Sequence, residues 1–284
     1  MALHPLAGVI SKLRRADEHL VVLYNEIRRY MNDSPYGLAG HRDTGDGKPG
    51  FTFHFTKQPP LYLSVIIGDI VHNLRGSLDY IAHELTVNNG AVPTRQTQFP
   101  ISLSQDDFIN QAISLKKLNT VSPKALKVVS AFQPYRLDED KRTLHFLWQL
   151  AKLSNMDKHH TLALSAFAAE ARTVFTHPDG RTFVSEFKDG LVYDGAVIAS
   201  MSADFFDEKI KTHLRIVGKI AFRDAPLTNH EVVGVLQNTR EFIGELIVPA
   251  VEPFFDPLPG ELRLTSHGLP ASMFSPAGSA LKNM

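Results

Sequence analysis

Two short stretches of the sequence concentrate side chains that support acid–base or metal chemistry. The first is GDIVHNLRGSLDYIAHEL at residues 68–85, and the second is NMDKHH at residues 155–160. Each combines histidine, aspartate and a strong base within a segment that has helical spacing of its apolar residues. Histidine changes its charge near neutral pH, and a carboxylate beside it can orient the imidazole. These two stretches are therefore the candidates for a functional centre.

The first stretch belongs to a helix predicted from about residue 61 to residue 87. One face is an apolar stripe, made of Ile67, Ile70, Val71, Leu74, Leu78, Ile81 and Leu85. At about 100° per residue the opposite face gathers polar residues and a glycine within roughly 80°; they are Asp69, His72, Gly76, Asp79 and His83, with Arg75 at the edge. An ordinary solvated face favours Lys, Glu and Gln, which are better helix formers. The face is either such a surface or a site, and its poor helix formers argue for a site.

Two chemistries suit this polar face. Asp69 with His72, and Asp79 with His83, are i,i+3 and i,i+4 pairs, a spacing at which carboxylate and imidazole groups converge on one divalent metal ion. Zinc, manganese and iron all accept such ligands. Alternatively, the histidines move protons, the aspartates orient them, and Arg75 holds an anionic group. The spacing permits both chemistries and does not decide between them.

The second stretch closes a helix predicted from about residue 138 to residue 158. An apolar stripe through Leu147, Trp148 and Ala151 continues onto Asn155 and Lys158, which are therefore predicted to point inward. A buried lysine needs a carboxylate partner, and Asp157 and Asp79 are the candidates. The alternative is simple capping, because Lys158, His159 and His160 place positive charge at a helix C-terminus, where the dipole favours it.

Composition limits the function classes. The chain has 284 residues, 30 basic and 30 acidic, and no cysteine. Because the net charge is zero, the protein as a whole is not attracted to nucleic acid or to a membrane surface. Because cysteine is absent, neither disulfides nor thiolate sites can form. No apolar run approaches the roughly 20 residues of a membrane span, and the N-terminus lacks the core of a signal peptide. We expect a cytoplasmic protein without membrane contact; the oligomeric state is left open.

The remaining pattern predicts an α+β fold. A helix is expected over residues 5–31, one short strand at Phe51–Phe53–Phe55, short helices at 105–114 and 122–132, and four to six strands between 161 and 223. Thr228 and Glu231 match a capping box that would start a last helix. The expected architecture is a bundle of about four long helices with an antiparallel sheet inserted before the last helix.

In terms of domains, residues 1–160 are expected to form a helical core and residues 161–224 a β-meander insert. Residues 225–252 would return to the bundle as a helix, and residues 253–284, rich in Pro, Gly and Ser, would form an irregular tail. All four segments are expected to belong to a single domain.

The two stretches together resemble a group of largely uncharacterised bacterial and phage proteins. That group shares an HNxRxxLDxxxxxL helix, matched by His72, Asn73, Arg75, Leu78, Asp79 and Leu85, and a later NxDKH segment, matched by Asn155, Asp157, Lys158 and His159. The resemblance covers roughly residues 61–161. A weaker resemblance is to HEPN-type helical bundles, many of which are metal-independent ribonucleases or nucleotide-binding proteins. The chain departs from their motif, because Gly76 follows Arg75 and His83 lies too far along.

Three functional hypotheses follow. The first is an enzyme acting on an anionic or phosphate-bearing substrate, RNA or a nucleotide, with His72, Asp79 and His83 as catalytic residues. Its substrate would be bound by Arg75, Asn73, Asn155, Lys158 and His159. The second is a metal-dependent hydrolase or oxidase with a divalent metal on Asp69, His72, Asp79 and His83. The third is a non-catalytic module in which these side chains form a buried polar network.

Overall fold

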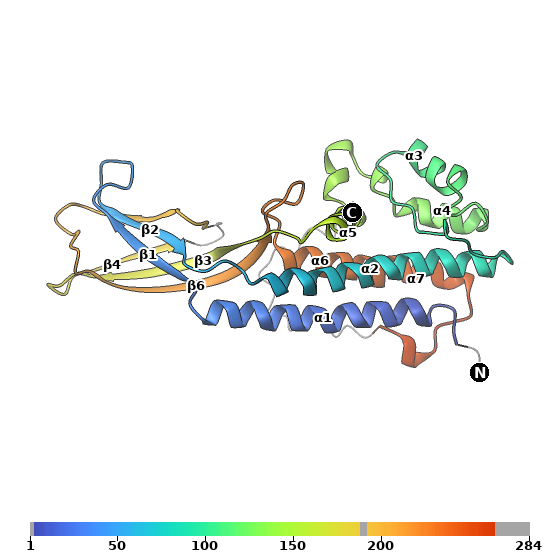
Figure 1. Ribbon diagram of the computed structural model, residues 1–284, viewed down its shortest axis with the longest axis horizontal. Coiled ribbons are helices and arrows are strands. Elements are labelled where there is room, and N and C mark those ends of the chain that lie inside the picture. The colour runs from blue at the N-terminus through green and yellow to red at the C-terminus, as the bar shows by residue number, and fades with distance from the viewer. Residues whose placement is uncertain (1–2, 188–191, 265–284) are drawn as a thin grey trace. The chain divides into compact units, whose positions relative to one another are not determined.

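The structure is a computed structural model that describes residues 3–187 and 192–264 (Figure 1). In chain order, its helices and strands are α1 (Ala7–Asn32), β1 (Tyr36–His41), β2 (Gly50–Phe55), α2 (Leu61–Asn88), α3 (Gln105–Ile109), α4 (Pro123–Ala131), α5 (Phe146–His159), β3 (Leu164–Thr176), β4 (Thr182–Phe187), β5 (Val197–Ser200), β6 (Lys211–Phe222), α6 (Val232–Glu241) and α7 (Val248–Val251). A π-helical turn follows α3 at Asn110–Ser114, and another joins α6 to α7 at Phe242–Ile247. Short 3₁₀ turns lie at Pro134–Arg136, Glu139–Leu144, Glu252–Phe254 and Gly260–Leu262.

The expected architecture is wrong. Within the described residues the fold is α+β with seven α-helices and two three-stranded antiparallel sheets, not a bundle of about four long helices with one inserted sheet. The strand orders are β1-β2-β5 and β4-β3-β6. The strands after residue 161 are therefore not a meander: β5 leaves its chain neighbours and pairs with β2.

The described residues divide into two compact units. One contains the described parts of Met1–Leu23, Val65–Thr161 and Val233–Met284, and the other contains those of Tyr24–Ser64 and Leu162–Val232. The second unit holds both sheets. The first unit holds α3 to α7 together with the first part of α1 and most of α2.

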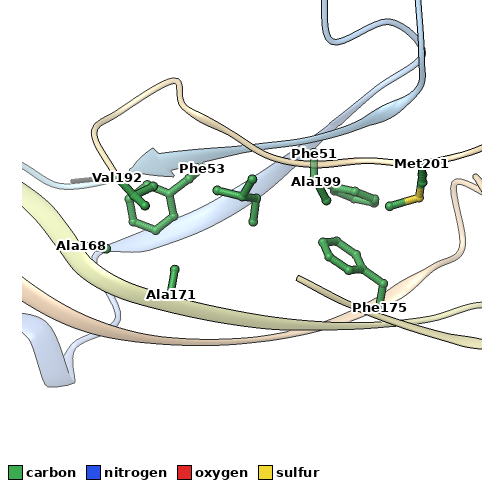
Figure 2. Close-up of a cluster of buried hydrophobic side chains, with 9 residues drawn as sticks. Phe51, Phe53, Ala168, Ala171, Phe175, Val192, Ala199 and Met201 are labelled. Atoms are coloured by element: carbon green, nitrogen blue, oxygen red, sulfur yellow. The ribbon is translucent and has the colours of Figure 1, made fainter. Parts of the chain in front are cut away.

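Aromatic side chains explain why the second unit needs two sheets. Phe51 and Phe53 alternate along β2 and are buried in one cluster with Phe175 of β3, and the centroids of the Phe51 and Phe175 rings are 4.9 Å apart. Figure 2 shows these rings between the two layers, with Ala171 on one side and Ala199 on the other. Each sheet buries one apolar face against the other, as half-exposed antiparallel sheets do.

Only one strand, at Phe51–Phe53–Phe55, was expected in this part of the chain, but a second strand precedes it. Tyr36–His41 forms β1, which pairs with β2 in register from Tyr36 opposite Phe55 to His41 opposite Gly50. Two glycines and an alanine hide the strand pattern in the sequence. In β2, residue 50 has to be a glycine for a packing reason, since a Cβ there would overlap the Ala199 carbonyl of the neighbouring strand β5.

In the first unit, the Phe242 ring packs against three rings from the end of α4 and the start of α5. Its ring lies 6.0 Å from the Phe132 ring, 5.1 Å from the His145 ring and 5.6 Å from the Phe146 ring, measured between centroids. Two residues before Phe242, Arg240 of α6 donates from Nη2 to Asp17 Oδ2 of α1 at 2.6 Å. These contacts fix α6 and the π-helical turn after it against α1, α4 and α5.

Two predicted helix starts are wrong. The helix expected from residue 138 begins at Phe146, because His145 adopts an extended ψ of 132° and its Nδ1 accepts from Leu147 N as an N-cap. The helix expected from Thr228 begins at Val232. Residues 229–231 instead pair with the end of β6, where Phe222 N donates to the His230 carbonyl and Glu231 bridges to Ala221.

Other expectations are confirmed. Pro123–Ala131 forms α4, with Ser122 accepting from Ala125 N as its N-cap and Pro123 in the first turn. The apolar stripe of α2 is buried from Ile67 to Leu85. In the expected irregular tail, residues 253–264 carry only short 3₁₀ turns, and residues 265–284 lie outside the described part of the chain.

His145 gives the first unit a predicted sensitivity to acid. It is 5% exposed, and burial lowers its pKa to about 4 from 6.5. The folded state therefore favours the neutral ring: its contribution to stability is complete above pH 6.5 and falls as pH drops toward 4. Between pH 7.5 and pH 5 we expect this residue to remove about 2 kcal/mol from the free energy of unfolding.

Urea unfolding of the wild type and of His145→Asn at both pH values measures this loss. Asparagine still accepts the cap hydrogen bond but does not titrate. The wild type should lose about 2 kcal/mol more than the variant on acidification. Parallel losses in the two proteins would contradict the assignment.

Candidate functional site

Arg75 and Asp79 of α2 form a clamp on the backbone of Phe99. Arg75 Nη2 donates to Asp79 Oδ1 at 2.7 Å and to the Phe99 carbonyl at 2.7 Å. Phe99 N donates to the same Asp79 oxygen at 3.0 Å. The Arg75 side chain is 18% exposed and the Asp79 side chain 31% exposed, so the ion pair is partly shielded from solvent. Both polar backbone groups of Phe99 are thereby bonded to one ion pair, the Arg75–Asp79 clamp.

The chain after Phe99 is held in the same way. Residues 92–104 are outside any helix or strand, so no ladder satisfies their backbone groups. The buried Gln133 donates to the Pro100 carbonyl at 3.0 Å and accepts from Ser102 N at 3.0 Å. Gln111 donates to the Ile101 carbonyl at 3.2 Å and to Ser102 Oγ at 2.9 Å. Side chains from three segments thus fix residues 99–102.

A basic pocket of about 350 Å³ opens beside this segment. It is lined by Arg95, Gln96, Gln98, Ser114, Leu115, Lys116 and Lys117. Its two walls are joined at the backbone, where Gln98 N donates to the Lys117 carbonyl at 3.4 Å. Three of the lining residues are cationic and none is acidic, so the pocket carries a local positive field in a chain of zero net charge.

Each wall of the basic pocket is shaped by its own local structure. A turn at residues 94–97, in which Thr94 N donates to Thr97 Oγ1 at 2.9 Å, presents Arg95 and Gln96. The other wall lies after the π-helical turn Asn110–Ser114, where Lys116, two residues beyond the turn, is left-handed with φ of +57°. A left-handed conformation is costly for a residue with a Cβ and is usually left to Gly or Asn.

Lys117 is the half-buried cation of the pocket. Its Nζ donates to Gln111 Oε1 at 2.7 Å. Burial lowers the pKa of Lys117, the Arg75 guanidinium lowers it further, and the Asp79 and Asp107 carboxylates raise it. Arg75 and Asp79 therefore influence the pocket in two ways. They hold the backbone of Phe99, next to the lining residue Gln98, and they shift the pKa of Lys117.

The two predicted stretches do meet, at Gly68. A Cβ on Gly68 would lie 2.5 Å from Asp157 Oδ1, so α5 can approach α2 there because residue 68 has no side chain. Burial, together with the Asp69 carboxylate, raises the pKa of Asp157, and His72 lowers it. The structure therefore brings Asp69, His72 and Asp157 into one neighbourhood. His72 and Asp69 are both exposed.

The three predicted catalytic residues have separate partners. His72 lies near Asp157, Asp79 is bonded within the clamp, and His83 Nδ1 lies 3.0 Å from Glu84 Oε1. Among the residues described, no group of three or more His, Cys, Asp or Glu side chains is placed to hold a metal ion. The four residues of the metal hypothesis are thus not gathered as a ligand set.

The predicted substrate-binding residues are also spread apart. Asn73 is buried, and its Nδ2 donates to the Asp69 carbonyl one turn earlier in α2 at 2.8 Å. Asn155, Lys158 and His159 are exposed, so the prediction that the first two point inward is wrong. The buried stripe of α5 ends at Ser154, and the last turn projects beyond it. Arg75 keeps an anionic partner, but that partner is Asp79.

Sequence reasoning missed Arg95, Lys116 and Lys117. They lie in loops, where no periodicity marks them, and they meet only because the clamp and two glutamines position the chain between them. The one local signal is Lys116-Lys117 directly after a helix end, at a place where glycine is the usual residue.

Comparison with protein-family models, curated proteins and solved structures gave no match. In the part of the chain that is described, no helix is both long enough and apolar enough to cross a bilayer.

The clamp predicts a structural role for Asp79. Replacing it with alanine leaves the Phe99 N–H without its acceptor and the Arg75 guanidinium without its carboxylate partner, and we expect the free energy of unfolding to fall by about 2–3 kcal/mol. His83→Ala, one turn further along α2 and exposed, should change it by less than about 0.5 kcal/mol.

Denaturant unfolding of both variants and the wild type gives these values. If Asp79 were a catalytic residue without a structural role, Asp79→Ala would be about as stable as the wild type. Equal stability of Asp79→Ala and His83→Ala would therefore contradict the structural role.

Proposed function

We propose that the protein binds a phosphate-bearing ligand in the basic pocket. The observation that carries the proposal is the lining itself: Arg95, Lys116 and Lys117 converge on one concave site without an acidic residue among them. Within the described residues, neither Arg95 nor Lys116 forms an ion pair or a side-chain hydrogen bond with the protein. Their charges are available to a ligand.

Other features support a phosphate in this pocket. The guanidinium of Arg95 can bind two phosphate oxygens side by side, and ammonium groups add point charges. Ser114 and the amides of Gln96 and Gln98 supply neutral donors around the cations. The volume of about 350 Å³ is at the lower end of small-ligand sites.

Lys116 also supports a binding role on energetic grounds. A left-handed conformation costs a non-glycine residue roughly 1–2 kcal/mol. Lysine at this position therefore lowers stability, and a role for its charge accounts for its presence. The clamp residues Arg75 and Asp79 take a positioning role in this proposal: they hold the wall that carries Gln98, and they do not touch the ligand.

Inorganic phosphate tests the proposal. Isothermal titration calorimetry at pH 7.5 and low salt should show that phosphate binds saturably to the wild type. Lys116→Gly and Arg95→Ala should each lower the affinity for phosphate about fivefold or more. Lys116→Gly should at the same time keep or raise the free energy of unfolding, because glycine relieves the left-handed strain. The loss of affinity would then be independent of any loss of fold.

Lys124→Ala is the matched control. Lys124 is an exposed lysine in the first turn of α4, outside the pocket, and its removal changes the net charge by the same amount. Its affinity should stay within twofold of the wild type. The proposal fails if phosphate does not bind saturably, or if Lys124→Ala weakens binding as much as Lys116→Gly does.

A further inference from the structure

We infer that the basic pocket takes a terminal phosphomonoester, a dianion, rather than an internal phosphodiester of a nucleic acid. This inference rests on the proposed function and narrows it. It separates the two ligand sources that the sequence left open, a small anionic molecule and RNA. Three features of the site support it: its charge, its surroundings and the rest of its lining.

The charge of the pocket fits a dianion. Arg95, Lys116 and Lys117 line it without an acidic residue among them, so it offers three positive charges to a bound anion. A phosphomonoester carries about −1.5 to −2 at pH 7, whereas each diester phosphate carries one negative charge. The second charge of the monoester is matched by cations that a diester would leave without a partner.

Lys117 makes the difference between the two anions larger. Its ammonium group is half-buried, and the groups that face it are Arg75 and Asp79 from α2 and Asp107 from α3. Burial and Arg75 oppose its charged form. An anion beside it favours that form, and a dianion does so more strongly than a monoanion.

The surroundings do not suit a nucleic-acid chain. Binding along a polynucleotide requires a basic track that follows successive phosphates. Here the first turn of α3 carries the exposed Asp106 and Asp107, and Asp107 is near enough to act on Lys117. A neighbouring phosphate on that side of the pocket would approach the Asp107 carboxylate.

The rest of the lining indicates the organic part of the ligand. The lining has no aromatic ring on which a base could stack. Gln96, Gln98 and Ser114 offer amides and a hydroxyl, and Leu115 is the one aliphatic side chain. This combination suits a small hydroxylated group, such as that of a sugar or polyol phosphate.

Three probes test the inference by isothermal titration of the full chain. They are glucose 6-phosphate, an eight-residue oligouridylate with free hydroxyls at both ends, and the same oligonucleotide with a 5′-phosphate. We expect glucose 6-phosphate and the 5′-phosphorylated chain to bind, each at least fivefold more weakly to Lys116→Gly. The chain without a terminal phosphate should not bind detectably.

The outcomes separate this inference from the proposed function. If the oligonucleotide without a terminal phosphate binds as well as the phosphorylated one and Lys116→Gly weakens both, the pocket binds phosphate but the inference is wrong. If no probe binds, both are wrong.

The pH dependence gives a second test. The second ionisation of a phosphomonoester lies near pH 6, so affinity for glucose 6-phosphate should fall about tenfold between pH 7.5 and pH 5. Sulfate remains a dianion throughout, and its affinity should change less than twofold. A phosphomonoester affinity that does not fall on acidification would overturn the selection for a dianion.

Discussion

The candidate site depends on one ion pair that bonds to a backbone. Arg75 and Asp79 lie one helical turn apart on α2, and together they satisfy both the N–H and the carbonyl of Phe99. The segment they hold has no strand partner, so side chains must replace a sheet ladder. Gln133 and Gln111 continue this role at residues 100–102. Arg95, Gln96 and Gln98, which form one wall of the basic pocket, directly precede that segment in the chain.

This constraint changes how the HNxRxxLD pattern is understood. Arg, Asn and Asp in a helix suggested chemistry, yet in this fold Asn73 bonds to its own helix, and Arg75 and Asp79 shape the chain beside them. Breaking a shielded charge pair costs more than the pair itself contributes, because the remaining group loses its partner. Residues of this kind can therefore be indispensable without touching a ligand. The cations that remain available to one are Arg95 and Lys116, with Lys117 held between Gln111 and the pocket.

The sequence predicted what depends on local pattern. The buried stripe of α2 and the Ser122 cap of α4 follow from periodicity and from capping chemistry, and both are present. The prediction failed where distant segments decide. β1 is a strand because β2 lies beside it, and residues 229–231 leave the expected helix because β6 offers them backbone partners. Likewise, the meeting of the two motif stretches was expected, but its form was not: Asp157 rests on Gly68, while Lys158 is exposed.

The clamp is tested most directly by amide hydrogen exchange at Phe99, measured by NMR in the wild type and in Asp79→Ala. The account predicts that the Phe99 N–H is protected in the wild type and exchanges close to the rate of an unstructured chain in the variant. The amides of Leu74 and Leu78, within α2, serve as controls and should remain protected from exchange in both proteins. Equal protection of Phe99 in the two proteins would show that Asp79 does not hold this segment.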